Sequence, residues 1–283
     1  MTSQISEPVV AQEIKPRHMT FPLTELNNKY FFGGNPLLTA YIAALSATFP
    51  AGEAEFIESI RLYKDKIEDP WLLQQIKGFI GQEGHHSHQH KKINKAFTDH
   101  GIDATRIENH LYQDIRKYTS QDYATPKLRL AVTAGMEHMT AILSQYILTH
   151  PEILEQLEEP VRDLILWHCV EEIEHKSVAF DVFMLCENDQ KYLQKIQLIQ
   201  TAQFAVRITA YTSAIAWWSK ELPSWKQTKA FAKFMFGKNG MVPGIRRSYM
   251  DYYRKDFHPE DHKTNVLIKK WQDELRKPEQ QIN

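Results

Sequence analysis

The stretch WHCVEEIEHK, residues 167–176, places two histidines and three glutamates between the apolar runs VRDLIL and SVAFDVFML. Offsets of four and seven residues fall on one face of an α-helix, so His168, Glu172 and His175 point in the same direction. The apolar flanks indicate that this face is buried. Because a buried carboxylate without a partner costs several kcal/mol or takes up a proton, this pattern is typical of metal ligands.

Two further segments contain the same kinds of side chain. Glu83 and His86 form another Glu-x-x-His pair in QEGHHSHQHKK. Glu137 stands among Ala, Val, Gly and Met in AVTAGMEHM, which is a poor environment for a solvated acid. We therefore predict that all three side chains face the protein interior.

A fourth acid is expected near Pro50, in FPAGEAEF. Glu53 is our first choice because it directly follows the proline, where the helix is expected to kink or restart. Glu55 and Glu58 compete with it, and Glu58 is the second choice.

Read in order, the four segments contain one Glu, a Glu-x-x-His pair, one Glu and a second Glu-x-x-His pair. This is the ligand arrangement of ferritin-like di-iron and di-manganese carboxylate bundles. Two neighbouring divalent cations repel each other, and four carboxylates cancel their charge, while neutral imidazoles suit iron, with manganese as an alternative. The predicted ligands are Glu53, Glu83, His86, Glu137, His168, Glu172 and His175.

Neighbouring polar residues receive other roles. His90 lies seven residues after Glu83 on the same face, and we predict that it is an outer partner of a ligand and not a ligand itself. Glu171 and Glu174 turn away from the ligand stripe, so solvent or an ion pair is expected for each. Cys169 lies beside the stripe and is expected to be inert packing.

Long segments between sparse prolines and glycines predict helices, and strand signals are nearly absent. The predicted helices span 36–67 with an interruption at Pro50, 71–100, 103–120, 126–150, 160–185 and 192–222. We predict an all-α fold: a ferritin-like four-helix bundle with additional C-terminal helices. A single domain is expected over 1–283, with a mobile tail at 1–30, a metal-binding core at 36–186 and covering helices at 190–283.

The composition narrows the classes of partner. A net charge of −1 gives no basic excess, so we expect no nucleic-acid partner. The two cysteines cannot form a disulfide framework, which favours a reducing cytoplasm. The first 18 residues lack the apolar stretch of a signal peptide. A homodimer is one expectation for the oligomeric state.

The most apolar segment is 204–218, FAVRITAYTSAIAWW, which is too short for a membrane span and contains Arg207. A buried core helix is the first interpretation. The alternative is peripheral contact with a membrane surface.

Motifs over nearly the whole chain resemble a bacterial family of predicted metal-dependent hydrolases. They are FPAGEAEFI, QEGHHSHQHKKIN, MEHMTA, WHCVEEIEHKSVAFDV and YYRKDFHPEDH. The resemblance implies a shared metal site. Over residues 50–185 the ligand order is also similar to that of p-aminobenzoate N-oxygenase-type arylamine oxygenases. Their di-iron centre takes four Glu and three His, and His168 would be the third histidine.

Three functions fit these patterns. The first is an O2-activating di-iron oxygenase or oxidase with two Fe ions, an external electron donor and an apolar or aromatic small molecule as substrate. The second is a binuclear metal-dependent hydrolase. The third is a non-catalytic iron-binding or ferroxidase bundle. About a hundred residues beyond the fourth helix suggest a covered substrate pocket and not a storage cage.

Overall fold

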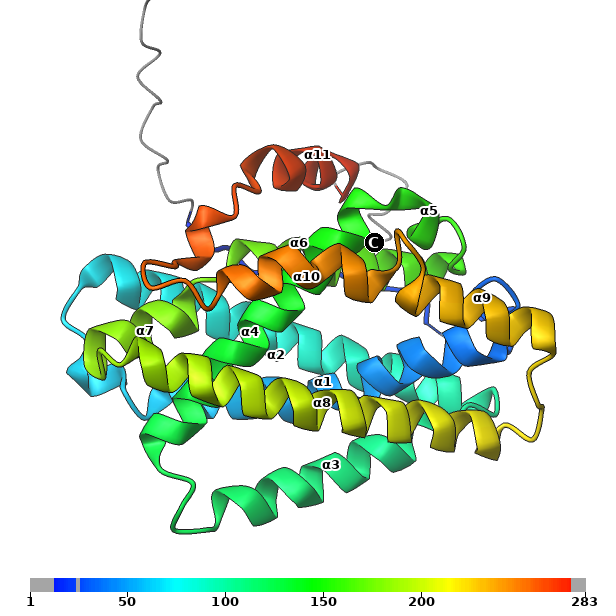
Figure 1. The fold of residues 1–283 in the computed structure, drawn as a ribbon, viewed down its shortest axis with the longest axis horizontal. Helices are drawn as coiled ribbons and strands as arrows, with labels where there is room; N and C mark the ends of the chain where they lie inside the picture. Colours follow the sequence, from blue (N-terminus) through cyan, green and yellow to red (C-terminus); the bar gives the residue numbers. More distant parts are fainter. Residues whose placement is uncertain (1–12, 24–25, 276–283) are drawn as a thin grey trace, which may run out of the picture.

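The computed structural model describes residues 13–23 and 26–275, and this part of the chain contains helices and no β-strand (Figure 1). The predicted all-α fold is confirmed. The α-helices are α1 (Pro36–Arg61), α2 (Pro70–Asp99), α3 (Ala104–Thr119), α4 (Pro126–Thr149), α5 (Pro151–Leu154), α6 (Glu159–Glu174), α7 (Val178–Cys186), α8 (Gln190–Trp218), α9 (Trp225–Phe236), α10 (Met241–Asp251) and α11 (Asn265–Leu275). Two 3₁₀ turns, η1 (Lys64–Lys66) and η2 (Pro259–Asp261), lie in the connections.

Local sequence explains where the long helices begin. Each of α1, α2 and α4 starts with a proline, whose missing N–H is not needed in the first turn. The preceding side chain accepts a hydrogen bond from a backbone amide of that first turn. These caps are Asn35, Asp69 and Thr125.

Helix α1 is continuous through Pro50, where the sequence predicted an interruption. Proline has no N–H, so the carbonyl of Ser46 loses its helical partner. Asn94 of α2 replaces it, donating from Nδ2 to that carbonyl at 3.2 Å. The Pro50 carbonyl in turn accepts bonds from the hydroxyls of Ser87 and Tyr112, each at 3.1 Å. Neighbouring helices therefore hold the proline inside the helix.

The helix predicted over 160–185 is instead two helices, because α6 ends at Glu174 and α7 begins at Val178. Lys176 lies in the break and is buried. Its ammonium donates to the carbonyl of His262 at 2.7 Å and to Thr264 Oγ1 at 3.0 Å. These partners are more than eighty residues away, so the local pattern did not indicate the break.

The packing places four ligand-bearing segments around one interior. α1 packs against α2, α4 packs against α6 and α7, and α8 lies along both α1 and α4. α10 and α11 cover α4 and α6, as Figure 1 shows above the long helices. In the described ranges, every helix is too short or too polar to cross a bilayer. The bundle topology assigned to the four segments remains a prediction.

The N-terminal region differs from the tail expected over 1–30. Residues 13–23 lie along the core, and Ile14 is buried. Ile14 and Pro16 press onto α2 where Gly78 and Gly81 leave room for them. Two glycines on one face of α2 allow this close approach. The sequence pattern did not indicate that the N-terminal segment would contact them. Residues 1–12 and 24–25 lie outside the described part.

Replacing Gly78 by alanine is expected to destabilise the protein by about 1–3 kcal/mol. The new Cβ would lie 2.3 Å from the backbone oxygen of Ile14, so the N-terminal segment must move. Gly84→Ala is the matched control on the same helix, because its Cβ meets nothing within 4 Å. Alanine is the better helix former, and this control should gain up to about 1 kcal/mol. Urea unfolding of both variants measures the difference; equal midpoints would contradict the proposed packing.

Candidate metal centre

The structure brings all seven predicted ligands to one place in the interior. Glu53 comes from α1, two residues from α2, Glu137 from α4, two residues from α6, and one from the residue that caps α6. None of the seven is more than 3% exposed. They are Glu53, Glu83, His86, Glu137, His168, Glu172 and His175.

Six of the seven form two groups whose ligand atoms lie within 4.8 Å of one another. One group is Glu53, His86 and His168, and the other is Glu83, Glu172 and His175. Glu137 adjoins the second group, with Oε2 3.2 Å from Nε2 of His175. Each group offers carboxylate and imidazole atoms together, a combination that suits divalent metal ions.

Two carboxylates lie between the groups. Oε1 of Glu172 is 2.9 Å from Nε2 of His168, 3.4 Å from Nδ1 of His86 and 3.6 Å from Nε2 of His175. Oε1 of Glu83 is 3.1 Å from Nε2 of His175 and 3.5 Å from Nδ1 of His86. Both carboxylates are therefore placed where they could contact an ion in either group.

Many polar atoms of this centre have no hydrogen-bond partner, although most buried polar groups in proteins have one. The unpaired atoms are both carboxylate oxygens of Glu53, Glu83 and Glu137, Oε2 of Glu172, Nδ1 of His86 and Nε2 of His175. Atoms that bind one ion at about 2.0–2.2 Å lie about 3 Å apart when they are at right angles. Within the groups the spacings are 3.1 Å for Glu83 and His175, 3.6 Å for Glu172 and His175, and 3.9 Å for Glu53 and His168, which correspond to right angles and wider ones. The residues therefore fit metal ions.

The pKa values of two buried carboxyl groups show that their charged forms are unfavourable in this arrangement. Burial raises the pKa of Glu53 well above its ordinary value, and the nearby charge of Glu83 raises it further. Burial likewise raises the pKa of Glu137 to about 8. Without cations, burial therefore shifts both groups toward the protonated form.

The pKa values of two histidines are also raised. Burial lowers the pKa of His86, but the hydrogen bond to Glu171 and the nearby carboxylates of Glu172 and Glu83 raise it well above the ordinary value. The pKa of His175 is also raised well above its ordinary value, because the carboxylates around it, Glu137, Glu172 and Glu83, together outweigh its burial. Four groups of the centre therefore favour binding a proton.

Each histidine is held on its far side by a second partner. Nε2 of His86 lies 3.1 Å from Oε2 of Glu171, and Nδ1 of His175 lies 2.9 Å from Oε1 of Gln82. Nδ1 of His168 lies 2.6 Å from Nε2 of His90, which thus occupies the outer position that its spacing predicted. Such partners orient a ligating imidazole and set its tautomer.

The tautomer of His168 follows from a chain of bonds that starts at Pro50. Asn94 donates its amide to the free carbonyl of Ser46, so its Oδ1 accepts the Ser46 hydroxyl at 2.6 Å. The Ser46 oxygen then accepts from Nδ1 of His90 at 2.8 Å. His90 accepts in turn from Nδ1 of His168, which leaves the Nε2 lone pair of His168 facing the centre.

Glu171 is buried and joins an ion-pair network, where the sequence allowed either solvent or an ion pair. Its Oε1 is 3.0 Å from Nη1 of Arg17, and Nη2 of Arg17 is 2.6 Å from Glu174. Gln82 donates to Glu174 at 3.0 Å. Sequence reasoning missed Arg17 and Gln82 as outer residues. Arg17 lay in the expected tail, and Gln82 had only its position beside Glu83 as a signal.

Aromatic rings surround the histidines. Centroid distances are 4.5 Å for Phe49 and His168, 4.8 Å for Trp167 and His86, and 5.0 Å for Phe79 and His175. The site thus has an apolar wall that strengthens electrostatic interactions inside it. Burial raises the pKa of Cys169 to about 12, so its thiol stays protonated. The side chain is packed in the interior and unreactive, as expected.

The competing acids of α1 lie elsewhere. Glu55 pairs with Arg129 at 2.6 Å, and Glu58 pairs with Arg61 at 2.6 Å with its side chain 55% exposed. Only Glu53 of these three points its carboxylate into the centre with both oxygens unpaired.

Glu53→Gln is therefore expected to lower the bound metal by about one ion per chain. The amide keeps the size of the side chain but removes its charge. Glu58→Gln is the control and should retain the metal content of the parent. Elemental analysis after equal dialysis measures both variants. A loss in Glu58→Gln with none in Glu53→Gln would reverse the assignment.

The helices and this centre define an all-α protein with two buried carboxylate–histidine groups that could hold metal. A family model described as predicted metal-dependent hydrolase matches residues 15–263. Because the match covers most of the chain, the protein belongs to this family. No significant match was found among the curated proteins or the solved structures compared.

Proposed function

We propose that this protein is a metal-dependent hydrolase with a two-metal centre formed by the seven converging residues. The observation that carries the proposal is the pair of buried ligand groups joined by Glu83 and Glu172, with their ligand atoms left unpaired. Membership of the family supports hydrolysis over the oxygenase chemistry that the ligand pattern alone suggested.

When bound, two divalent ions supply Lewis acidity toward a carbonyl or phosphoryl oxygen and make water more acidic. The residues of the chain do the rest. Four carboxylates balance the charge of the ions, and the partners of the histidines hold three imidazoles in one orientation. The aromatic wall excludes bulk water. An ester or a phosphoester is the substrate class that this chemistry suits.

A di-iron oxygenase or oxidase is the second candidate. The third histidine and the apolar aromatic wall favour it, because imidazole suits iron and a dry site protects a reactive oxidant. This function would require O2, an external electron donor and an apolar or aromatic small molecule. The family match favours the hydrolase.

One experiment separates these functions. Metal-free protein is loaded anaerobically with Zn(II), Mn(II) or Fe(II) in parallel. Each sample is assayed for cleavage of chromogenic ester and phosphoester substrates without O2, and for O2 consumption after air is admitted. Hydrolysis that needs about two ions per chain, and is lost in Glu172→Gln, supports the proposal. O2 uptake by the Fe(II) sample alone, with no hydrolysis, would support the second candidate instead.

A further inference from the structure

Basic residues gather in one part of a nearly neutral chain. The net charge of the whole protein is −1, yet the segment 222–250 contains no Asp or Glu. Its basic residues are Lys226, Lys229, Lys233, Lys238, Arg246 and Arg247. Such segregation creates a local positive potential that attracts an anionic partner.

Helix α9, within this segment, presents an apolar stripe to solvent. None of its residues is buried, and its inner side is formed by partly buried residues such as Phe231 and Phe234. On the other side Trp225 is 72% exposed and Phe236 is 65% exposed. These two are eleven residues apart, so their directions differ by only about 20°. Lys229 lies between them on this side, with its ammonium 5.3 Å from the Trp225 ring.

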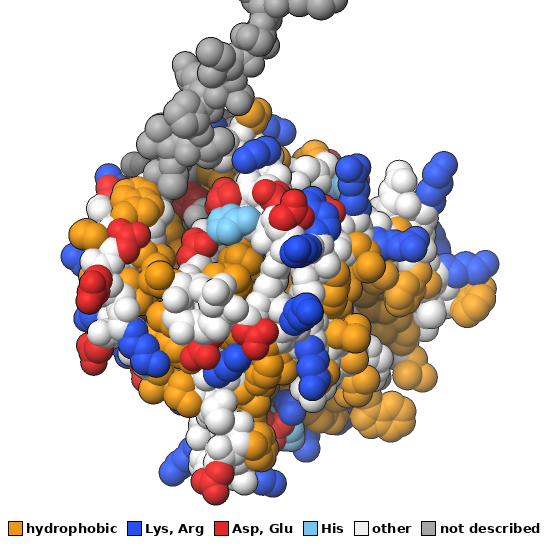
Figure 2. All heavy atoms as spheres, turned by 60° about the vertical axis from the view of Figure 1, so that its left-hand side comes forward, with side chains coloured by type: hydrophobic (Ala, Val, Ile, Leu, Met, Phe, Trp, Pro, Cys, Tyr) orange, Lys and Arg blue, Asp and Glu red, His pale blue; other side chains and the backbone are white. Residues whose placement is uncertain are grey.

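The end of α8 and the loop after it extend the same apolar surface. Trp217 is 74% exposed and Leu222 is 82% exposed. Figure 1 shows the end of α8, the loop and the start of α9 together at the right-hand end of the molecule. Hydrophobic side chains also protrude among lysines and arginines at the right-hand edge of Figure 2. We call Trp217, Leu222, Trp225 and Phe236, with Lys226, Lys229 and Lys233, the α9 face.

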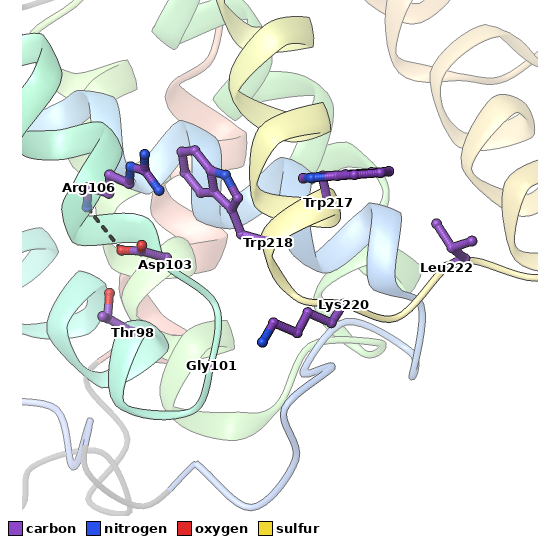
Figure 3. Close-up of a pocket in the computed structure, with 8 residues that line it drawn as sticks. All are labelled: Thr98, Gly101, Asp103, Arg106, Trp217, Trp218, Lys220 and Leu222. Atoms are coloured by element: carbon purple, nitrogen blue, oxygen red, sulfur yellow. Dashed lines mark hydrogen bonds between the residues drawn. The ribbon is translucent and has the colours of Figure 1, made fainter.

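A hollow of about 680 Å³ adjoins this face (Figure 3). Trp217 and Leu222 belong both to its lining and to the α9 face. Its charged lining is two cations and one acid. Arg106 has its guanidinium 4.2 Å from the Trp218 ring, Lys220 extends toward Gly101, and the Asp103 carboxylate accepts from the backbone amide of Arg106. An anionic group and an adjoining apolar chain would both find partners here.

We propose that the α9 face docks on a membrane surface that contains anionic phospholipid, with the hollow receiving a headgroup. Exposed tryptophan and phenylalanine beside lysines are what an interfacial helix uses, because the rings enter the headgroup region while the ammonium groups contact phosphate. The contact lies at the C-terminal end of the apolar segment 204–218 and beyond it. In α8 itself, Ile208 and Ile215 are buried whereas Val206 is exposed, so α8 is only partly a core helix.

Charge argues against a second copy of the chain as the occupant. A twofold contact places the same surface on both subunits, so lysines would face lysines across the interface. Glu221 does not relieve this repulsion, because its carboxylate is already 3.2 Å from Lys29. An anionic bilayer complements the same charges.

The test is co-sedimentation of the metal-loaded full chain with vesicles. Vesicles of phosphatidylcholine alone are compared with vesicles that contain about 30% phosphatidylserine. Binding is expected only to the anionic vesicles and should weaken as salt is raised to about 0.5 M. Because each lysine near the surface contributes about fivefold, Lys229→Gln/Lys233→Gln should weaken binding about thirtyfold.

A second variant, Trp225→Ala/Phe236→Ala, should weaken binding at least as much, because it removes the two rings of α9. Trp71→Ala/Lys77→Gln is the matched control, since it removes an exposed tryptophan and an exposed lysine from the start of α2. It should bind like the parent. Circular dichroism and metal content confirm that each variant is folded, and the exposed lysine pair still tests the face if the aromatic pair does not fold.

Three results would overturn the proposal. The first is that the parent does not sediment with the anionic vesicles, or that it binds both vesicle types equally. The second is that the α9 variants bind as tightly as the control. Sedimentation equilibrium could instead show a dimer that Trp225→Ala dissociates, with no vesicle binding by the parent. The outcome is independent of the reaction assays, so failure here leaves the proposed function untouched.

Discussion

Glu172→Gln is expected to weaken the binding of both metal ions by at least about a hundredfold. Loss of an outer partner of a ligand already lowers metal affinity about 10–100-fold. Glu172 lies in the middle of the centre, so its loss should lower the affinity further. Its Oε1 lies within 3.6 Å of the ring nitrogens of His168, His86 and His175. An amide in its place carries no charge, and its nitrogen cannot bind a cation.

Equilibrium dialysis followed by elemental analysis measures this loss. Glu159→Gln is the control on the same helix, because its side chain is 75% exposed and forms an ion pair with Arg162 at the surface, away from the centre. Far-ultraviolet circular dichroism should show the same helix content in both variants. If Glu172→Gln retained two ions with the affinity of the parent, the central position of this carboxylate in a two-metal site would be wrong.

Stripping the metals is expected to make stability fall as pH rises from about 7 to 9. The pKa of Glu137 is about 8 in the folded protein, against an ordinary value of 4.5. In this window the folded state therefore binds more protons than the unfolded chain, and it loses stability as they are released. Glu137 alone accounts for a decrease on the order of 1 kcal/mol.

The other shifted groups of the metal centre do not reverse the sign in this window. Glu53, His86 and His175 also have raised pKa values, so their contributions are likewise lost as pH rises. The pKa values of His90 and His168 are lowered by burial, and their effect is confined to pH values below about 6.5.

Urea unfolding of chelator-treated protein at pH 7, 8 and 9 tests this prediction. Protein loaded with metal should be more stable throughout, by about 4 kcal/mol when the free metal is a thousand times its Kd. Glu137→Gln should reduce the pH dependence of the metal-free protein, because it removes the group with the pKa of about 8. Metal-free stability that rises over this range would contradict the assigned protonation.

Several features could be predicted from local sequence. The helix starts predicted at residues 36 and 126 coincide with those of α1 and α4, and the start predicted at 71 lies one residue after that of α2. The spacing of His168, Glu172 and His175 predicted one shared direction, and the structure places the three around one point. These inferences rest on helix geometry, which depends on neighbours within a few residues.

Other features required contacts between distant segments. The continuity of α1 at Pro50 depends on Asn94, and the break after α6 accompanies the contacts of Lys176 with residues 262 and 264. The position of the N-terminal segment depends on space above Gly78. These contacts join residues that are far apart along the chain, so patterns of neighbouring residues cannot predict them.

The sequence by itself determined the helical class and the seven side chains able to meet in the interior, because helical periodicity relates residue spacing to direction. Only the tertiary structure decided which atoms meet. It placed Glu53 and not Glu58 in the centre, gave each histidine its outer partner and left the apolar side of α9 exposed. These outcomes depend on how helices pack, and packing is set by side chains that are far apart along the chain.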